Sequence, residues 1–179
     1  QNDLQRSKSA YEKVITLREN YQDAYKNLCV IYLKLKENEN AEAAAKKAIE
    51  IDPENYQSFH LLATALIALK KYEEAIDALN KGIGLNPENA LMYNNLGSCY
   101  LGLNRLDMAE GAFKKAIELT PENPTSHYNL ASVLQLKNRY EEALEHYYTA
   151  YELEPTPFYL SAAALGAMYA QNWEKAISL

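Results

Sequence analysis

The sequence predicts an all-α protein built from repeated pairs of helices. Two observations carry this prediction: prolines recur at one constant interval, and apolar residues between them recur at three- and four-residue steps. The prolines are Pro53, Pro87, Pro121 and Pro155, and each of the first three opens an identical Pro-Glu-Asn triplet. Other residue types share the period, at Ala41, Ala75, Ala109 and Ala143, at Leu28, Leu62, Leu96 and Leu130, and at Tyr25, Phe59, Tyr93 and His127.

Each unit contains two helices joined by a short turn. In the clearest unit, apolar residues recur at three- and four-residue steps, which places each set on one face of a helix. The first helix has Tyr93, Leu96, Gly97, Tyr100 and Leu103, and the second has Ala109, Ala112, Phe113, Ala116 and Leu119. The polar pair Asn104 and Arg105 separates the two helices, and Pro121 ends the second because it has no backbone donor. Gly97, like Ala63 and Ala131 in other units, allows two helix backbones to approach closely.

This pattern resembles the tetratricopeptide repeat, which has a period of about 34 residues, with an aromatic residue, Leu-Gly and Tyr in its first helix, then Ala, Phe, Ala and a closing Pro. The resemblance implies a right-handed α-solenoid of helix-turn-helix repeats forming one domain over residues 1–179. Four full repeats are expected at 22–55, 56–89, 90–123 and 124–157.

The two ends of the sequence are expected to be partial repeats. Residues 1–21 predict the second helix of a preceding unit, and residues 158–179 predict a further unit that is one residue short in its turn. Trp173 and Ala176 would open the second helix of that unit. Because arrays of this kind need capping elements, we expect a fragment of a longer array or an array that continues into another domain.

Composition narrows the classes of partner. With 24 acidic and 18 basic residues the formal net charge is -6, which disfavours nucleic acid as a partner because its phosphates would be repelled. The longest apolar run, Leu61 to Leu69, is too short to cross a bilayer, so no membrane insertion is expected. No targeting peptide is recognisable, and Cys29 and Cys99 are expected to be buried thiols, so a cytoplasmic location is predicted.

The resemblance implies that the first helices line a concave groove in which another protein or a peptide binds. One groove position holds Asn27, Leu61, Asn95 and Asn129, and an asparagine side chain can pair with a peptide bond of any sequence. Tyr128, Tyr159 and Tyr169 are additional tyrosines, which either anchor a partner or pack against a continuation of the array. The candidate groove residues are Lys26, Asn27, Lys34, His60, Thr64, Asn94, Asn95, Ser98, Tyr128, Asn129, Ser132, Tyr159 and Tyr169.

Several more specific activities are disfavoured. The clamp that binds chaperone C-termini in this family would need polar residues where Val30, Leu61 and Leu91 stand, although Lys26 fits it. No catalytic residues and no cofactor are predicted. His60, His127 and His146 are far apart in the sequence and form no ligand pair on one helix turn, so no metal site is expected.

Three functions are compatible with the sequence. The first is an interaction scaffold without catalytic activity, which binds a partner segment in the groove through Asn95, Asn129 and Tyr128. The second is the recruiting arm of a larger enzyme such as a glycosyltransferase. The third is an assembly scaffold that self-associates through exposed apolar ends of the array.

Overall fold

The structure is a computed structural model that describes residues 2–171, and these residues form ten α-helices without a strand. The expected fold class, an all-α helical repeat, is confirmed. Contacts between Cα atoms divide the chain into two compact units, Gln1–Glu88 and Asn89–Leu179. We describe each unit by itself.

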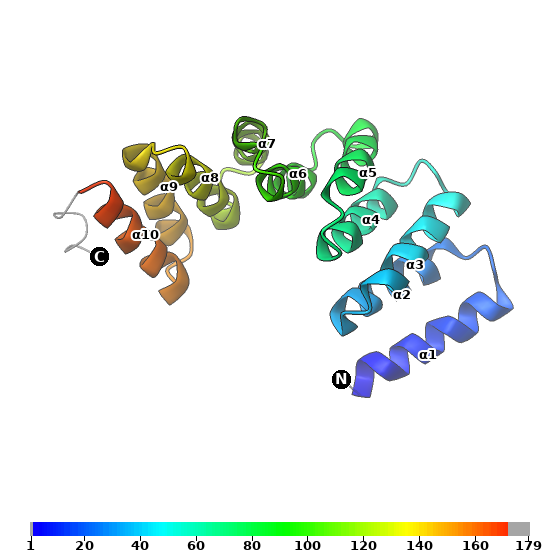
Figure 1. The fold of residues 1–179 in the computed structure, drawn as a ribbon. Coiled ribbons are helices and arrows are strands. Elements are labelled where there is room, and N and C mark those ends of the chain that lie inside the picture. Colours follow the sequence, from blue (N-terminus) through cyan, green and yellow to red (C-terminus); the bar gives the residue numbers. More distant parts are fainter. Residues whose placement is uncertain (1, 172–179) are drawn as a thin grey trace. The chain divides into compact units, whose positions relative to one another are not determined.

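Within the described residues each unit holds five helices, which are labelled in Figure 1. Unit 1 contains α1 (Asn2–Leu17), α2 (Gln22–Leu35), α3 (Asn38–Ile51), α4 (Tyr56–Ala68) and α5 (Tyr72–Leu85). Unit 2 contains α6 (Ala90–Gly102), α7 (Leu106–Leu119), α8 (Pro124–Leu136), α9 (Tyr140–Leu153) and α10 (Pro157–Tyr169). Successive helices pack against one another inside each unit, and the pairs α2–α3, α4–α5, α6–α7 and α8–α9 have the most extensive contacts.

The recurring Pro-Glu-Asn triplet has a structural reason. Its asparagine is the N-cap of the following first helix: the side-chain oxygens of Asn55, Asn89 and Asn123 accept hydrogen bonds from backbone N–H groups of α4, α6 and α8. An N-cap of this kind satisfies donors that the first helical turn leaves without a partner. The triplet therefore ends one helix with its proline and starts the next with its asparagine.

A left-handed residue closes each first helix. Lys36, Lys70, Asn104 and Asn138 have φ between 57° and 61°, and they recur at the same interval as the prolines. At Asn104 the backbone N–H of the next residue, Arg105, donates to the carbonyl of Tyr100 at 2.8 Å, and Asn104 N–H donates to Leu101 at 2.9 Å. This is the Schellman arrangement, and it lets the chain reverse within a short turn.

Helix α10, the first helix of the final repeat, departs from the period. The N-caps Asn89 and Asn123 are one full period apart. The N-cap of α10, Thr156, comes one residue earlier than a full period after Asn123. Its closing left-handed residue, Gln171, likewise comes one residue early after Asn138. We expected the missing residue in the turn after this helix. The structure instead has it in the linker before α10, so every residue of α10 holds a position one place later in the repeat than expected.

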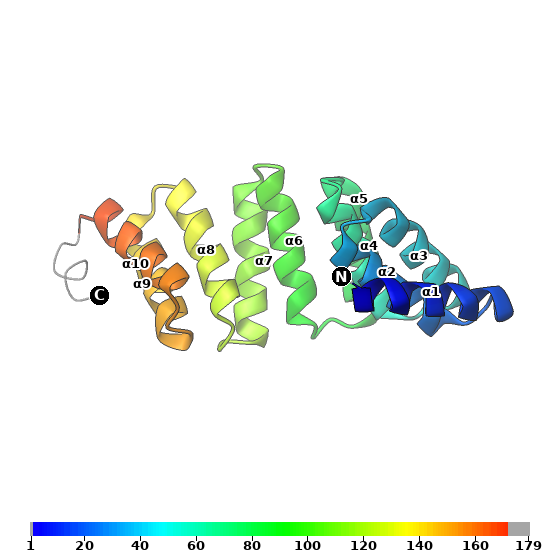
Figure 2. The same cartoon turned by 90° about the horizontal axis from the view of Figure 1, so that it is seen from below.

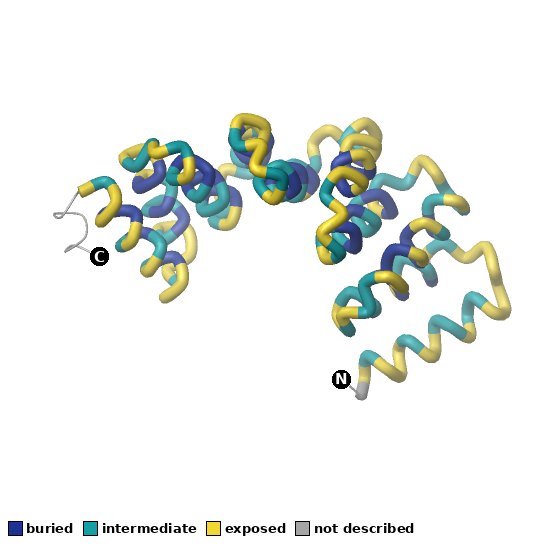
Figure 3. Tube along the Cα trace, in the orientation of Figure 1, coloured by how far each residue is buried: buried dark blue, intermediate teal, exposed yellow. Residues whose placement is uncertain are grey.

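Small residues allow the two helices of a pair to approach closely. Ala63, Ala131, Ala109 and Ala116 are completely buried. A Cβ atom added to Gly97 of α6 would lie 2.6 Å from the ring of Phe113 in α7. In Figure 3 the buried residues of each unit lie where helices face their neighbours. The ring of Phe113 thus fills the space that the absent side chain leaves.

Three ion pairs connect the second helix of one repeat to the start of the second helix in the next repeat. In all three the partners are the same number of residues apart in the sequence. They join Lys8 to Glu37, Glu42 to Lys71, and Glu110 to Arg139, each at 2.8 Å. Burial alone would disfavour the ionised form of Glu110. Hydrogen bonds from Lys114, Lys137 and Arg139 outweigh it and lower the pKa of Glu110 to about 2. These contacts fix the register of neighbouring helix pairs.

Two expectations about domain organisation stay predictions. One is the single domain over residues 1–179 with its repeat boundaries. The other is the second helix of the last unit, opened by Trp173 and Ala176, which lies outside the described residues.

Two glycine substitutions in one helix pair test the close packing. Gly97→Ala should destabilise the protein by about 1–3 kcal/mol, because the new methyl group would clash with Phe113. Gly111→Ala, in the exposed middle of α7 with nothing within 4 Å of the new atom, should stabilise it by about 0.4–1 kcal/mol. Denaturant melts of both variants measure the difference, and equal effects would contradict the packing argument.

Candidate functional site

The first helices lie side by side inside each unit. In unit 2, α8 contacts both α6 and α10, and in unit 1, α2 contacts α4. The helices of each unit are labelled in Figure 2. The predicted groove residues all lie on these helices. Those on α2 and α4 belong to unit 1, and those on α6, α8 and α10 belong to unit 2.

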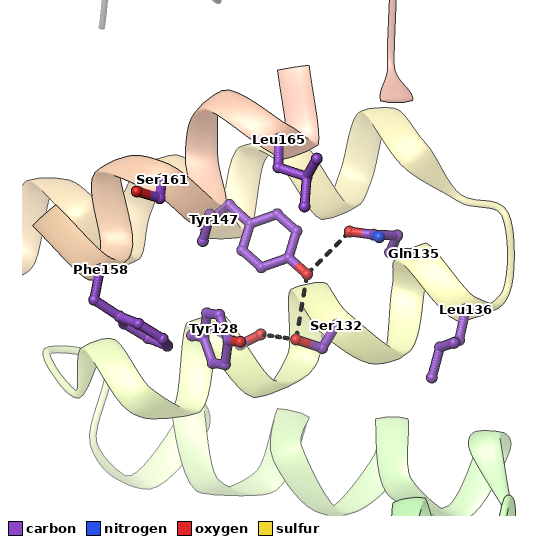
Figure 4. Close-up of a pocket in the computed structure, with 9 residues that line it drawn as sticks. Tyr128, Ser132, Gln135, Leu136, Tyr147, Phe158, Ser161 and Leu165 are labelled. Carbon is purple, nitrogen blue, oxygen red and sulfur yellow. Dashed lines mark hydrogen bonds between the residues drawn. The ribbon is translucent and has the colours of Figure 1, made fainter. Parts of the chain in front are cut away.

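A cavity of about 450 Å³ opens on this face of unit 2 (Figure 4). It lies among α8, α9 and α10, and it combines apolar side chains with a few polar groups. Its lining residues are Tyr128, Ser132, Gln135, Leu136, Tyr147, Phe158, Ser161, Ala162 and Leu165. A concave, largely apolar surface with a few fixed polar groups is typical of ligand sites.

The two polar side chains that α8 contributes to the cavity are held by one tyrosine of α9. The single hydrogen of the Tyr147 hydroxyl is shared between two acceptors, Ser132 Oγ at 3.2 Å and Gln135 Oε1 at 3.1 Å. Burial raises the pKa of Tyr147, so its hydroxyl stays protonated and remains a donor. Ser132 Oγ in turn donates to the Tyr128 carbonyl at 2.9 Å. These bonds fix the orientation of both polar side chains on α8.

Aromatic rings surround Tyr128 at one end of the cavity. Its ring centroid lies 4.9 Å from that of Phe158, 5.7 Å from that of Tyr147 and 6.0 Å from that of Tyr159. Tilted and edge-on pairs at these distances are attractive. Phe158 nevertheless remains 58% exposed, so most of its ring is available for contact with a ligand.

Asn94 does not belong to the exposed groove surface. It is 7% exposed, because its side-chain amide donates to Ser126 Oγ of α8 and its oxygen accepts from Asn129 Nδ2 at 3.4 Å. Asn94 therefore connects α6 to α8. Asn95 and Ser98 on α6 and Asn129 on α8 are half-buried, and Ser98 Oγ donates to the Asn94 carbonyl at 3.0 Å.

Tyr159 is also buried, at 8% exposure, and its hydroxyl lies 3.2 Å from Thr125 Oγ1. The physical reason is the shortened linker before α10, which moves Tyr159 from the expected groove position to the adjacent core position. The groove position passes to Phe158. Tyr169 remains exposed and stacks on Tyr140, with ring centroids 5.7 Å apart and an interplanar angle of 14°.

The predicted residues of unit 1 form a different surface. Lys26 makes an ion pair with Asp23 at 2.9 Å and donates to Gln57 of α4 at 3.4 Å, while Asn27 and Lys34 lie on α2 beside it. Thr64 Oγ1 donates to the His60 carbonyl at 2.9 Å. Burial lowers the pKa of His60, so this imidazole is biased towards its neutral form.

Sequence reasoning found Tyr128 and Ser132 but missed the rest of the cavity. Phe158 and Leu165 become groove residues once α10 is counted from Pro157, so the shortened interval before this helix was the signal that could have found them. Tyr147 stands one repeat after Phe113, and its hydroxyl is the addition that reaches the cavity. Sequence separation also gave no sign that His127 and His146 meet, and the structure places them in hydrogen-bond contact.

Three family models match the chain. Two are described as Tetratricopeptide repeat, over residues 60–124 and 112–145, and one is described as Anaphase-promoting complex, cyclosome, subunit 3, over residues 2–82. These matches agree with the helix pairs, the N-caps and the left-handed turns. The chain is a tetratricopeptide repeat protein. No curated protein matches it.

Several solved structures share the fold of this tetratricopeptide repeat protein. A MamA structure is 25% identical, with a TM-score of 0.79 over 86% of this chain and 90% of MamA. PilF of Pseudomonas aeruginosa is 22% identical, with a TM-score of 0.85 over 99% of this chain and 81% of PilF. YrrB, described as having an unusual peptide-binding site, is 23% identical, with a TM-score of 0.72 over 94% of this chain and 88% of YrrB.

In general terms this tetratricopeptide repeat protein is a protein-interaction scaffold, and its family is generally non-catalytic. None of the helices described in residues 2–171 has both the length and the apolar character needed to cross a membrane. Within the same residues, no group of three or more metal-ligating side chains comes together.

Alanine substitutions of the two neighbouring aromatic residues at the start of α10 test the register that the structure gives this helix. Tyr159→Ala should cost about 3 kcal/mol of stability because it empties a core position, whereas Phe158→Ala should cost less than about 1 kcal/mol. Circular dichroism melts of the two variants measure this. A larger loss for Phe158→Ala would mean that α10 has the other register.

Proposed function

We propose that this tetratricopeptide repeat protein binds an extended segment of a partner protein along α6, α8 and α10. One large apolar or aromatic side chain of that segment occupies the cavity beside Tyr128. The observation that carries the proposal is the cavity itself, because it combines exposed apolar walls with fixed polar groups on the face formed by the first helices.

The apolar walls supply most of the binding energy. Phe158 and Leu136 are both 58% exposed, and Leu165 is 48% exposed, so a ligand side chain removes their surface from water. Tyr128 and Phe158 are already held by their mutual contact, so little side-chain entropy is lost on binding. Aromatic residues in such a setting are frequent binding hot spots.

The half-buried asparagines supply contacts to the ligand backbone. Asn95 and Asn129 lie on the neighbouring helices α6 and α8. An amide side chain has two donors and an acceptor, so the bond from Asn129 to Asn94 leaves capacity for a peptide group. Each such bond contributes about 0.5–1.5 kcal/mol and is indifferent to the ligand side chain.

A peptide is the ligand class that the comparisons support. YrrB, which shares the fold, is described as having an unusual peptide-binding site. The recruiting arm of an enzyme, self-association through the array ends, the exclusion of nucleic acid and a cytoplasmic location stay predictions.

The experiment is a pull-down from extracts of the cells that make the protein, with mass spectrometry to identify what is retained. The wild type is compared with Phe158→Ala, with the double variant Asn95→Ala and Asn129→Ala, and with Met108→Ala. Met108 is the matched control, because it is an exposed apolar residue of α7 in the same unit.

We expect a protein that the wild type and Met108→Ala retain and the two groove variants lose. In calorimetry with that partner, Phe158→Ala should weaken binding at least about tenfold, because truncating a hot-spot residue costs about 2 kcal/mol or more. If all four proteins retain the same partners, or none retains any, the groove is not the binding surface.

A further inference from the structure

His127 of α8 and His146 of α9 form a direct contact in unit 2. Their Nδ1 atoms are 3.0 Å apart, and their ring centroids are 5.3 Å apart. His127 Nε2 lies 2.9 Å from the Pro121 carbonyl oxygen, in the linker before α8. His127 is buried, and His146 is half-buried.

The contact results from a paired replacement within the repeat. At the position of His127 the three preceding repeats have Tyr25, Phe59 and Tyr93, and at the position of His146 they have Ala44, Ala78 and Ala112. Where the other repeats have an aromatic residue and an alanine, this repeat has two histidines. Of the four repeats, only this one combines them, so the contact is not a requirement of the fold.

The hydrogen bonds assign the protons of the neutral pair. The Pro121 carbonyl can only accept, so His127 carries its proton on Nε2. His127 Nδ1 is then an acceptor, and His146 Nδ1–H is the donor to it. If both imidazoles were protonated, two N–H groups would face each other at this distance, and the contact would become repulsive.

The neighbouring groups leave the imidazoles without a strong acidic partner. Burial lowers the pKa of His146, and the proximity of His127 lowers it further. Lys114 of α7 acts in the same direction, while Glu145 and Glu142 of α9 oppose it. The balance of these effects disfavours protonation of His146 in the folded protein.

We propose that His127 and His146 are a proton-sensitive contact that holds α8 against α9 when both imidazoles are neutral and loosens when both are protonated. The contact is close to the cavity, because His127 is adjacent to Tyr128 and His146 is adjacent to Tyr147. Acidification would then weaken the α8–α9 pair and alter the cavity that they line. This inference holds whether or not the cavity binds a peptide.

The direction of the effect follows from proton linkage. A histidine whose pKa is lower in the folded state is protonated more readily in the unfolded chain, so stability falls as the pH falls through the ordinary value of 6.5. Above that value the contribution of the contact is fully present. The sensitive window begins near 6.5 and extends below it.

Hydrogen exchange at about pH 7.5 and about pH 5.5, corrected for intrinsic rates, tests the proposal on the whole chain. The double variant His127→Tyr and His146→Ala restores the residue types of Tyr93 and Ala112, and His60→Gln is the control for a half-buried histidine in unit 1. In the wild type and in His60→Gln, the equilibrium constant for opening of α8 and α9 should be larger at the lower pH. The increase is up to about tenfold for each proton that the folded state excludes. The double variant should lack this rise.

Equal pH dependence in the wild type and the double variant would overturn the proposal. Should the double variant fail to fold, an NMR titration of the wild-type imidazoles decides the question. The expected result is coupled titration of the two rings with the pKa of His146 below 6.5, and independent titration of both at the ordinary value would contradict it.

Discussion

The structure depends on the close approach of the two helices in each pair. Inside the pair α6–α7 the ring of Phe113 lies against Gly97, and between neighbouring repeats the ring of Tyr147 in α9 lies against Gly166 in α10. These rings are buried against helix backbone, and they set how closely the helices approach one another. The cavity of unit 2 is lined by α8, α9 and α10, so its shape depends on the contact of Tyr147 with Gly166.

The fold could be predicted from the sequence because its signals are local and repeated. The period, the closing prolines and the small residues each predict the same helix pair. The position of the missing residue near α10 could not be predicted, because its loss leaves the helical pattern intact on both sides. Whether it falls before or after the helix is decided by packing, which in the structure buries Tyr159 and exposes Phe158. For this reason the predicted positions include the cavity residues Tyr128 and Ser132 of α8 but none of the cavity residues of α10.

The repeat formed by α8 and α9 differs from its neighbours on both sides of α8. Towards the cavity, Tyr147 adds a hydroxyl that orients Ser132 and Gln135. Towards the linker, His127 meets His146. Ligand binding and proton uptake would therefore both act on α8. Repeat proteins can concentrate such changes in one repeat, because each repeat mainly contacts its neighbours.

Site-specific photo-crosslinking tests most directly whether the face formed by α6, α8 and α10 is the working surface. The photoreactive residue p-benzoylphenylalanine is introduced in place of Leu136, which lines the cavity, or in place of Met108 on α7, and each protein is irradiated in an extract of the cells that make it. Our account predicts a covalent adduct with one partner protein from the Leu136 position and none from the Met108 position. An adduct from Met108 alone would contradict it, as would the same adduct in equal yield from both positions.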